Sequence, residues 1–148
     1  LWKDIEEPTA FLVGSADAGA HWSYDAGFGY ATRLLGYWIR EKNIMSLEEG
    51  VRKLTFMVAS IFGLADRGLL RPGMAADLVV FDPATVRECA PEMVQDLPGN
   101  EKRLVQKAVG IEATIVNGEV LVERGDHTGA LPGMVLGNGN GSALQAAA

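Results

Sequence analysis

The chain has 148 residues, of which 48% are hydrophobic and 22% are charged, and its formal net charge is −6. These values are typical of one folded domain and exclude a disordered chain, and the acidic balance argues against a nucleic-acid partner. No run of about 18 apolar residues is present, so we expect no membrane partner. The single cysteine, Cys89, cannot form an internal disulfide, and the first residues have neither the basic nor the apolar region of a leader peptide, so we expect a cytoplasmic location.

The first predicted elements are a strand, a glycine-rich turn and a helix. Residues 9–13 (TAFLV) are an apolar run typical of a buried strand. The small side chains of residues 14–21 (GSADAGAH) let the backbone turn tightly and approach another group closely. From residue 30 to 40 the apolar side chains recur at helical spacing, which predicts a helix.

A second helix has clear start and stop signals. Ser46 precedes Leu-Glu-Glu, which predicts a capping box in which Glu49 reaches back to the helix start. Apolar residues then repeat at steps of four and three over residues 47–61, and Gly63 is a natural stop.

After residue 63 the pattern changes to strands and turns. Residues 77–82 (DLVVFD) predict a strand that ends at Asp-Pro. Residues 84–100 are bordered and interrupted by prolines and predict a long irregular connection, with a further strand over 104–109. Asn117-Gly118 between two β-rich runs predicts a type I′ hairpin.

The order of these elements predicts an incomplete fold. A buried strand such as residues 9–13 needs neighbouring strands on both sides and helices over it, and one β/α unit cannot supply them. We therefore expect a missing N-terminal portion upstream of Leu1. Residues 138–148 have little to bury, and we expect a flexible tail there.

Several stretches, in the right order, resemble one family. Residues 14–21 resemble the turn after the eighth barrel strand in N-acyl-D-amino-acid deacylases, the D-aminoacylase branch of the amidohydrolase superfamily. Residues 64–82 (LADRGLLRPGMAADLVVFD) resemble the segment that leaves the barrel in many amidohydrolases. Residues 91–98, 110–118 and 128–133 resemble the linker and the end of the same chains.

The resemblance implies an α/β fold in two parts. Residues 1–66 would be the last strand and helices of a TIM-like barrel, residues 67–137 the C-terminal half of a small β-sandwich, and residues 138–148 the tail. The His-x-His pair of the family's first strand, its bridging Cys or Lys and its middle-strand histidines are absent from this chain. The sequence also departs from the family after Pro132-Gly133, where a basic residue is expected.

The function that the resemblance implies is metal-dependent hydrolysis of a linear amide, such as a small-molecule N-acyl-D-amino acid. The implied cofactor is a divalent metal, with zinc the expected ion. Because most metal ligands lie outside this chain, we expect activity from the full-length parent and none from the chain alone.

Asp17 is the candidate catalytic residue. It follows the predicted strand at the end where TIM-barrel active sites lie, and the resemblance makes it the metal-associated general base. A metal lowers the pKa of bound water toward about 7, and a nearby carboxylate can take that proton and pass it to the leaving amine. From local sequence alone, an Asp in such a turn is more often a helix cap or an Asx-turn.

Other candidates favour structural roles. His21 could be a metal ligand, but a loop histidine that holds the turn or lines the substrate pocket fits better, since the family's ligands lie elsewhere. Asp25 is expected to cap a helix, Cys89 to be a small apolar filler and His127 to be exposed. We expect packing roles for Trp22 and Trp38. We expect Asp66-Arg67 and Asp77 to tie the linker to the barrel.

Two alternatives remain open. One keeps the superfamily but changes the substrate to a cyclic amide of the hydantoin or dihydropyrimidine type, or to a dipeptide. The other is a non-catalytic β-rich binding module with a helical N-terminal arm, which the absent metal ligands favour and the unpartnered strand at residues 9–13 opposes.

Solution behaviour separates these alternatives. An incomplete barrel exposes apolar surface, so we expect residues 1–148 alone to bind an apolar dye strongly and to melt without a cooperative transition. Dye fluorescence and calorimetry measure both properties. A stable monomer with a sharp calorimetric transition would support the binding module instead.

Overall fold

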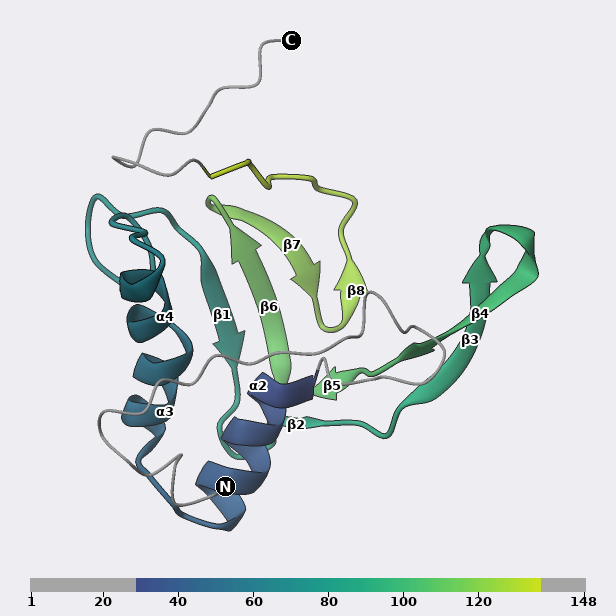
Figure 1. Ribbon diagram of the computed structural model, residues 1–148, viewed down its shortest axis with the longest axis horizontal. Helices are drawn as coiled ribbons and strands as arrows, with labels where there is room; N and C mark the ends of the chain where they lie inside the picture. Colours follow the sequence, from purple (N-terminus) through teal and green to yellow (C-terminus); the bar gives the residue numbers. More distant parts are fainter. Residues whose placement is uncertain (1–28, 137–148) are drawn as a thin grey trace, which may run out of the picture. The chain divides into compact units, whose positions relative to one another are not determined.

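The computed structural model describes residues 29–136 (Figure 1). The chain divides into two compact units, whose described residues are 29–50 with 81–111 and 51–80 with 112–136. The predicted strand at residues 9–13, the turn at 14–21 and the tail at 138–148 lie outside the described residues. Within 29–136 no helix is long and apolar enough to cross a membrane. The cytoplasmic location and the division at residue 66 stay predictions.

The helix predicted over residues 30–40 is present as two consecutive segments. Helix α2 covers Tyr30–Arg33 and the π-helical segment η2 covers Leu34–Glu41. The wider winding is visible where the Lys42 N–H donates to the Tyr37 carbonyl five residues back, at 2.9 Å. Segment η2 supplies most of the buried apolar side chains of the unit that contains residues 29–50 and 81–111, namely Leu34, Leu35 and Ile39.

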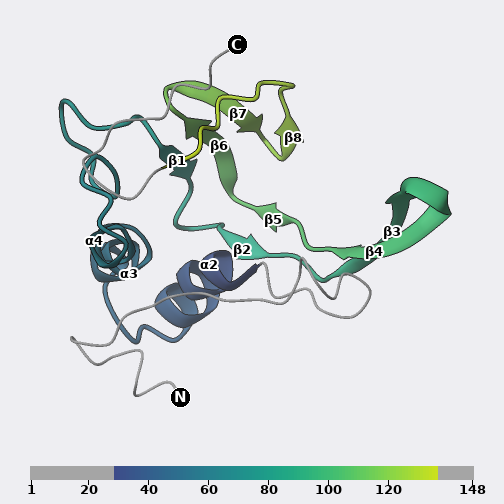
Figure 2. The same ribbon diagram turned by 45° about the horizontal axis from the view of Figure 1, so that its top comes forward.

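The prediction of an irregular connection over residues 84–100 is wrong, because the structure forms strands there. Strand β2, Arg87–Glu88, pairs antiparallel with β5, Ala108–Val109. Strand β3, Glu92–Leu97, pairs antiparallel with β4, Glu101–Val105, and the two are joined by the 3₁₀ turn η3, Pro98–Asn100. The β3–β4 hairpin extends away from helix α2 in both views (Figures 1 and 2).

The prolines of this region border the strands and do not interrupt them. Pro83 follows the strand that ends at Phe81, Pro91 directly precedes β3, and Pro98 begins η3. These are the positions where a missing N–H costs no ladder bond. The further strand predicted over residues 104–109 is divided between β4 and β5, because Gln106 and Lys107 lie where pairing changes from β3 to β2.

The β3–β4 hairpin carries a bidentate ion pair. Both oxygens of Asp96 accept bonds from the Arg103 guanidinium at 2.7 Å, and this contact lowers the pKa of the Asp96 carboxyl. Lys107 Nζ lies 3.0 Å from Glu92 Oε1 at the base of the same hairpin. Because both pairs are largely exposed, they set the strand register more than they add stability.

The second predicted helix is divided into α3, Leu47–Leu54, and α4, Phe56–Ile61. The Glu49 N–H donates to Ser46 Oγ at 3.2 Å, which confirms the bond from the backbone to the serine side chain in the predicted capping box. Gly63 ends the helix as predicted, with φ 69° and the 2.8 Å bond from Leu64 N to the Ala59 carbonyl that a Schellman motif requires.

The buried face of this helix differs from the predicted stripe. Over 47–61 the predicted apolar positions are half-buried, except Ile61, which is 48% exposed. The more buried residues are Gly50, Lys53, Met57 and Ala59. The break at Thr55, whose φ is −121° and ψ is −84°, rotates the faces of α4 relative to an unbroken helix.

A four-stranded sheet has the order β1-β6-β7-β8, with bounds Leu78–Phe81, Ile111–Val116, Glu119–Glu123 and Asp126–His127. The predicted strand before Asp82 is confirmed as β1. Figure 1 shows β1 and β6 running in opposite directions. Asn117 and Gly118 have φ 49° and 84°, which confirms the type I′ turn between β6 and β7.

The packing around Val86 depends on glycine at position 110. Val86 is fully buried, and a Cβ added to Gly110 would lie 2.5 Å from the Val86 nitrogen. We expect Gly110→Ala to destabilise the protein by about 2–4 kcal/mol, combining the cost of φ 77° with the clash. Gly99→Ala is the matched control, because Gly99 has φ 75° and open space around it. Urea unfolding of the full-length protein measures both, and equal losses would contradict the steric argument.

Candidate functional site

The sequence-predicted catalytic segment lies outside the described residues. Asp17, His21, Trp22 and Asp25 all belong to residues 1–28, so their mutual geometry stays a prediction. Within residues 29–136, no group of three or more His, Cys, Asp and Glu side chains could hold a metal ion. The described residues therefore do not fit a metal centre by themselves.

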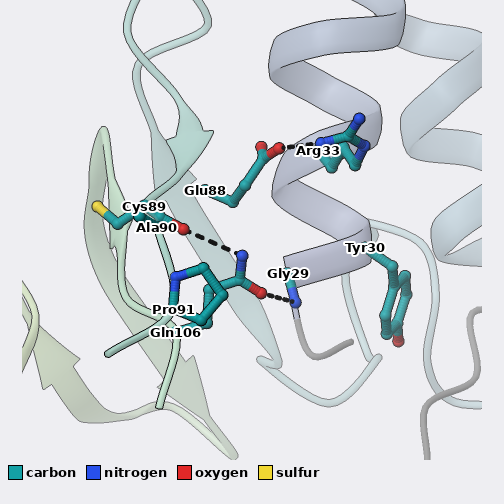
Figure 3. Close-up of a pocket in the computed structure, with 8 residues that line it drawn as sticks. All are labelled: Gly29, Tyr30, Arg33, Glu88, Cys89, Ala90, Pro91 and Gln106. Carbon is teal, nitrogen blue, oxygen red and sulfur yellow. Dashed lines mark hydrogen bonds and ion pairs between the residues drawn. The ribbon is translucent and has the colours of Figure 1, made fainter. Parts of the chain in front are cut away.

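A pocket of about 510 Å³ opens in the unit that contains residues 29–50 and 81–111 (Figure 3). It lies at the start of helix α2, next to strand β2 and the junction of β4 and β5. The lining residues come from three segments of the chain: Gly29, Tyr30 and Arg33; Glu88, Cys89, Ala90 and Pro91; and Gln106.

An ion pair links helix α2 to strand β2 at this pocket. Arg33 Nη1 donates to Glu88 Oε1 at 2.8 Å, with 54% of the arginine side chain and 18% of the glutamate side chain exposed. The Arg33 guanidinium also lies 4.9 Å from the centre of the Tyr37 ring, and Lys42 Nζ lies 5.2 Å from the same ring. The contacts with Glu88 and Tyr37 orient the Arg33 side chain, and at this exposure each is worth at most about 1 kcal/mol.

Gln106 makes two long-range hydrogen bonds across the pocket. Its Oε1 accepts from the Gly29 N–H at 3.1 Å, and its Nε2 donates to the Cys89 carbonyl at 3.0 Å. Figure 3 shows the amide between these two backbone groups. Sequence reasoning missed Gln106, since a glutamine between two short strands carries no local signal.

The other sequence candidates in the described residues have structural surroundings. Cys89 is half-buried and free, and its sulfur points away from Gln106 (Figure 3). His127 is exposed as predicted, and its Nδ1 accepts from the Gly129 N–H at 2.9 Å. Trp38 is half-buried and lies edge-on to Tyr37, with ring centres 4.9 Å apart.

A second polar cluster ties the segment before β1 to the hairpin turn. Asp77 Oδ2 is ion-paired with Arg67 Nη1, and Asp77 Oδ1 accepts from the Asn117 N–H at 2.8 Å. The Gly118 N–H donates to the Ala76 carbonyl at 3.0 Å. Asp77 thus ties this segment to the hairpin turn, a contact that the sequence did not predict. The tie to a barrel stays a prediction.

In both arrangements, the polar side chains bond to backbone groups or to each other. In the pocket, the carboxylate is paired with the guanidinium and the Gln106 amide is satisfied at both ends. In the Asp77 cluster, each carboxylate oxygen has a donor. Both places therefore connect backbone segments within the described part of the chain.

The comparison with protein-family models identifies the family. The model of the amidohydrolase family matches residues 12–122, which covers the predicted catalytic turn, helix α2, the strand pairs β2–β5 and β3–β4, and most of the four-stranded sheet. The chain belongs to the amidohydrolase family.

Relatives in the D-aminoacylase branch are similar to most of the chain. An N-acyl-D-aspartate deacylase of Alcaligenes xylosoxydans xylosoxydans is 40% identical over 114 residues, which is 76% of this chain. A solved D-aminoacylase with a binuclear metal centre is 31% identical over 87% of this chain, with a TM-score of 0.68. The N-acyl-D-glutamate deacylase of Bordetella bronchiseptica, solved with zinc and a phosphonate inhibitor, is 32% identical over 81% of it, with a TM-score of 0.61.

The chain spans only part of each relative. It covers 21% of the N-acyl-D-aspartate deacylase and 25% of the solved D-aminoacylase chain. These relatives confirm the predicted D-aminoacylase branch. The described part of the chain contains helices and sheets, which agrees with the predicted α/β class.

The Asp77 cluster is testable through stability. We expect Asp77→Ala to destabilise the protein by about 1–3 kcal/mol, because the Arg67 side chain is only 11% exposed and would lose its carboxylate partner. Asp126→Ala removes an exposed aspartate of β8 and serves as the control, with a change within about 0.5 kcal/mol. Chemical denaturation of the full-length protein provides the measurement, and an Asp77→Ala midpoint equal to that of the control would exclude the tie.

Proposed function

We propose that the full-length protein containing this chain hydrolyses the linear amide bond of N-acyl-D-amino acids. The observation that carries the proposal is the likeness to a solved D-aminoacylase over 87% of this chain, with a TM-score of 0.68 and 31% identity. Because the chain covers 25% of that relative, the substrate and activity belong to the longer protein.

The architecture that we propose has two parts. Residues 1–66 complete a TIM-like barrel, and residues 67–137 form part of a small β-sandwich, with residues 138–148 as a tail. The four-stranded sheet β1-β6-β7-β8 supports the second part, since its strands all follow residue 67. The segment 14–21 then lies at the barrel end where active-site residues gather.

The proposed cofactor is a divalent metal, with zinc the expected ion. Zinc in the solved N-acyl-D-glutamate deacylase and the binuclear centre of the solved D-aminoacylase support this proposal. Residues 29–136 contain no group of three or more His, Cys, Asp and Glu side chains that could hold a metal ion, so in this proposal most ligands come from other parts of the protein. When bound, such a metal polarises an amide carbonyl and acidifies water.

Asp17 is the proton-transferring residue in this proposal. An aspartate carboxylate is ionised at neutral pH and can accept a proton from the attacking water. The protonated carboxyl can then donate to the leaving amine nitrogen, which returns Asp17 to its starting state. His21, four positions on, would support the turn or line the substrate pocket.

Asp17→Asn tests the role directly. The amide is close in size to the carboxylate and cannot accept the proton, so we expect turnover of N-acetyl-D-amino acids by the full-length protein to fall about 10²–10⁴-fold. Release of the free amino acid measures the rate. Asp25→Asn, in the same segment, is the matched control and should stay within about threefold of the unsubstituted protein. Full activity of Asp17→Asn with unchanged metal content would falsify the proposed role.

A further inference from the structure

We propose that Asn117 is a deamidation site that the fold holds in check, and that its conversion loosens residues 130–136. Asn117 and Gly118 form the turn between β6 and β7, with φ 49° and 84°. All the groups involved belong to the described residues of one unit, 51–80 with 112–136. The inference goes beyond the proposed function, because it depends on no catalytic residue.

The type I′ turn favours a residue pair that is also chemically reactive. Both central residues need positive φ, which asparagine and glycine tolerate best. Glycine also leaves its own nitrogen unhindered, since it has no side chain beside it. Gly118 is exposed, and the nearest described atom to a Cβ added there would be the Ala76 Cβ, at 3.9 Å. Water therefore reaches a turn whose residue pair suits attack by a backbone nitrogen.

The reaction joins the Gly118 nitrogen to the Asn117 side chain. The nitrogen loses its proton to solvent and attacks Asn117 Cγ, so that a bond forms between the nitrogen and Cγ. The bond from Cγ to Nδ2 breaks, and Nδ2 leaves as ammonia after it takes a proton from water. Water then hydrolyses the cyclic imide at either carbonyl, which leaves aspartate or isoaspartate at position 117. Water is the co-reactant, and no group is oxidised or reduced.

The fold holds the two reacting groups with different partners. The Gly118 N–H donates to the Ala76 carbonyl at 3.0 Å, and Asn117 Nδ2 donates to the Pro132 carbonyl at 2.7 Å. The Asn117 N–H donates to Asp77 Oδ1 at 2.8 Å. Attack requires the Gly118 nitrogen to leave Ala76, and departure of Nδ2 requires the bond to Pro132 to break. The turn must therefore open locally before it can react.

Conversion removes a contact that the turn makes with the chain after β8. A carboxylate at position 117 has no donor for the Pro132 carbonyl, so this bond is lost. It also adds a negative charge to the residue whose N–H the Asp77 carboxylate accepts, and like charges repel. Residues 130–136 are largely apolar and exposed, with Leu131 87% exposed, so loss of the Pro132 bond loosens them.

The first experiment compares deamidation of Asn117 in the folded and the urea-unfolded full-length protein. Peptide mapping by mass spectrometry follows the conversion in a mildly alkaline buffer, and a synthetic peptide of residues 113–122 corrects for the effect of urea on the chemistry. Two bonds must open in the folded protein, and each shifts the open population about fivefold, so we expect conversion at least about tenfold slower there. Equal corrected rates, or no conversion in the unfolded protein, would overturn the inference.

Asp77→Ala tests whether the contacts of the turn provide the protection. This variant removes the acceptor of the Asn117 N–H, so we expect conversion in the folded protein to become about threefold faster or more, with the rate in urea unchanged. Asp126→Ala removes an exposed aspartate of the same sheet and should keep the unsubstituted rate. Equal rates for the two folded variants would contradict protection by these contacts.

Asn117→Asp tests the consequence, because it copies one product of the reaction. Asn100→Asp is the matched control, since Asn100 is an exposed asparagine with φ 63° in the turn between β3 and β4. We expect chymotrypsin to cut within residues 131–136 about threefold faster in Asn117→Asp, relative to cleavage elsewhere in the full-length protein. Equal relative cleavage in both variants would overturn the loosening. Neither experiment uses a substrate, so a protein without deacylase activity would overturn the proposed function alone.

Discussion

The backbone of Val86 is the point on which the unit of residues 29–50 and 81–111 depends. Its carbonyl accepts from Arg40 Nη1 at 2.6 Å, and its N–H donates to the Asp82 carbonyl at 2.9 Å. An added Cβ at Gly36 would lie 2.5 Å from the same carbonyl, and one at Gly110 would lie 2.5 Å from the nitrogen. Two glycines therefore let η2 and the β5–β6 junction approach one buried peptide, which fixes helix α2 next to strand β2.

The parts of the fold that follow from the sequence are those with local causes. Asn117-Gly118 forms its turn because both residues tolerate positive φ, and Gly63 ends its helix for the same reason. Strand β3 and the π-helical segment have non-local causes. Strand β3 exists because β4 pairs with it, and the prolines around it only indicated interruption.

The residues of the candidate site also differ in whether their cause is local in the sequence. A short motif with an aspartate after a predicted strand indicated Asp17, and the family resemblance gave it a role. Gln106 could not be found this way, because its partners lie 77 and 17 residues away in the chain and are backbone groups. A backbone N–H or carbonyl has no sequence identity, so only coordinates reveal that a side chain has been placed to meet it.

Many polar groups of the described residues have structural partners, although the chain belongs to a family of hydrolases. In the pocket and in the Asp77 cluster, each carboxylate has a donor within the described residues. These contacts hold together backbone segments that are far apart in the sequence. The catalytic residue that we propose, Asp17, precedes this part of the chain, and the described residues supply the contacts that hold the fold.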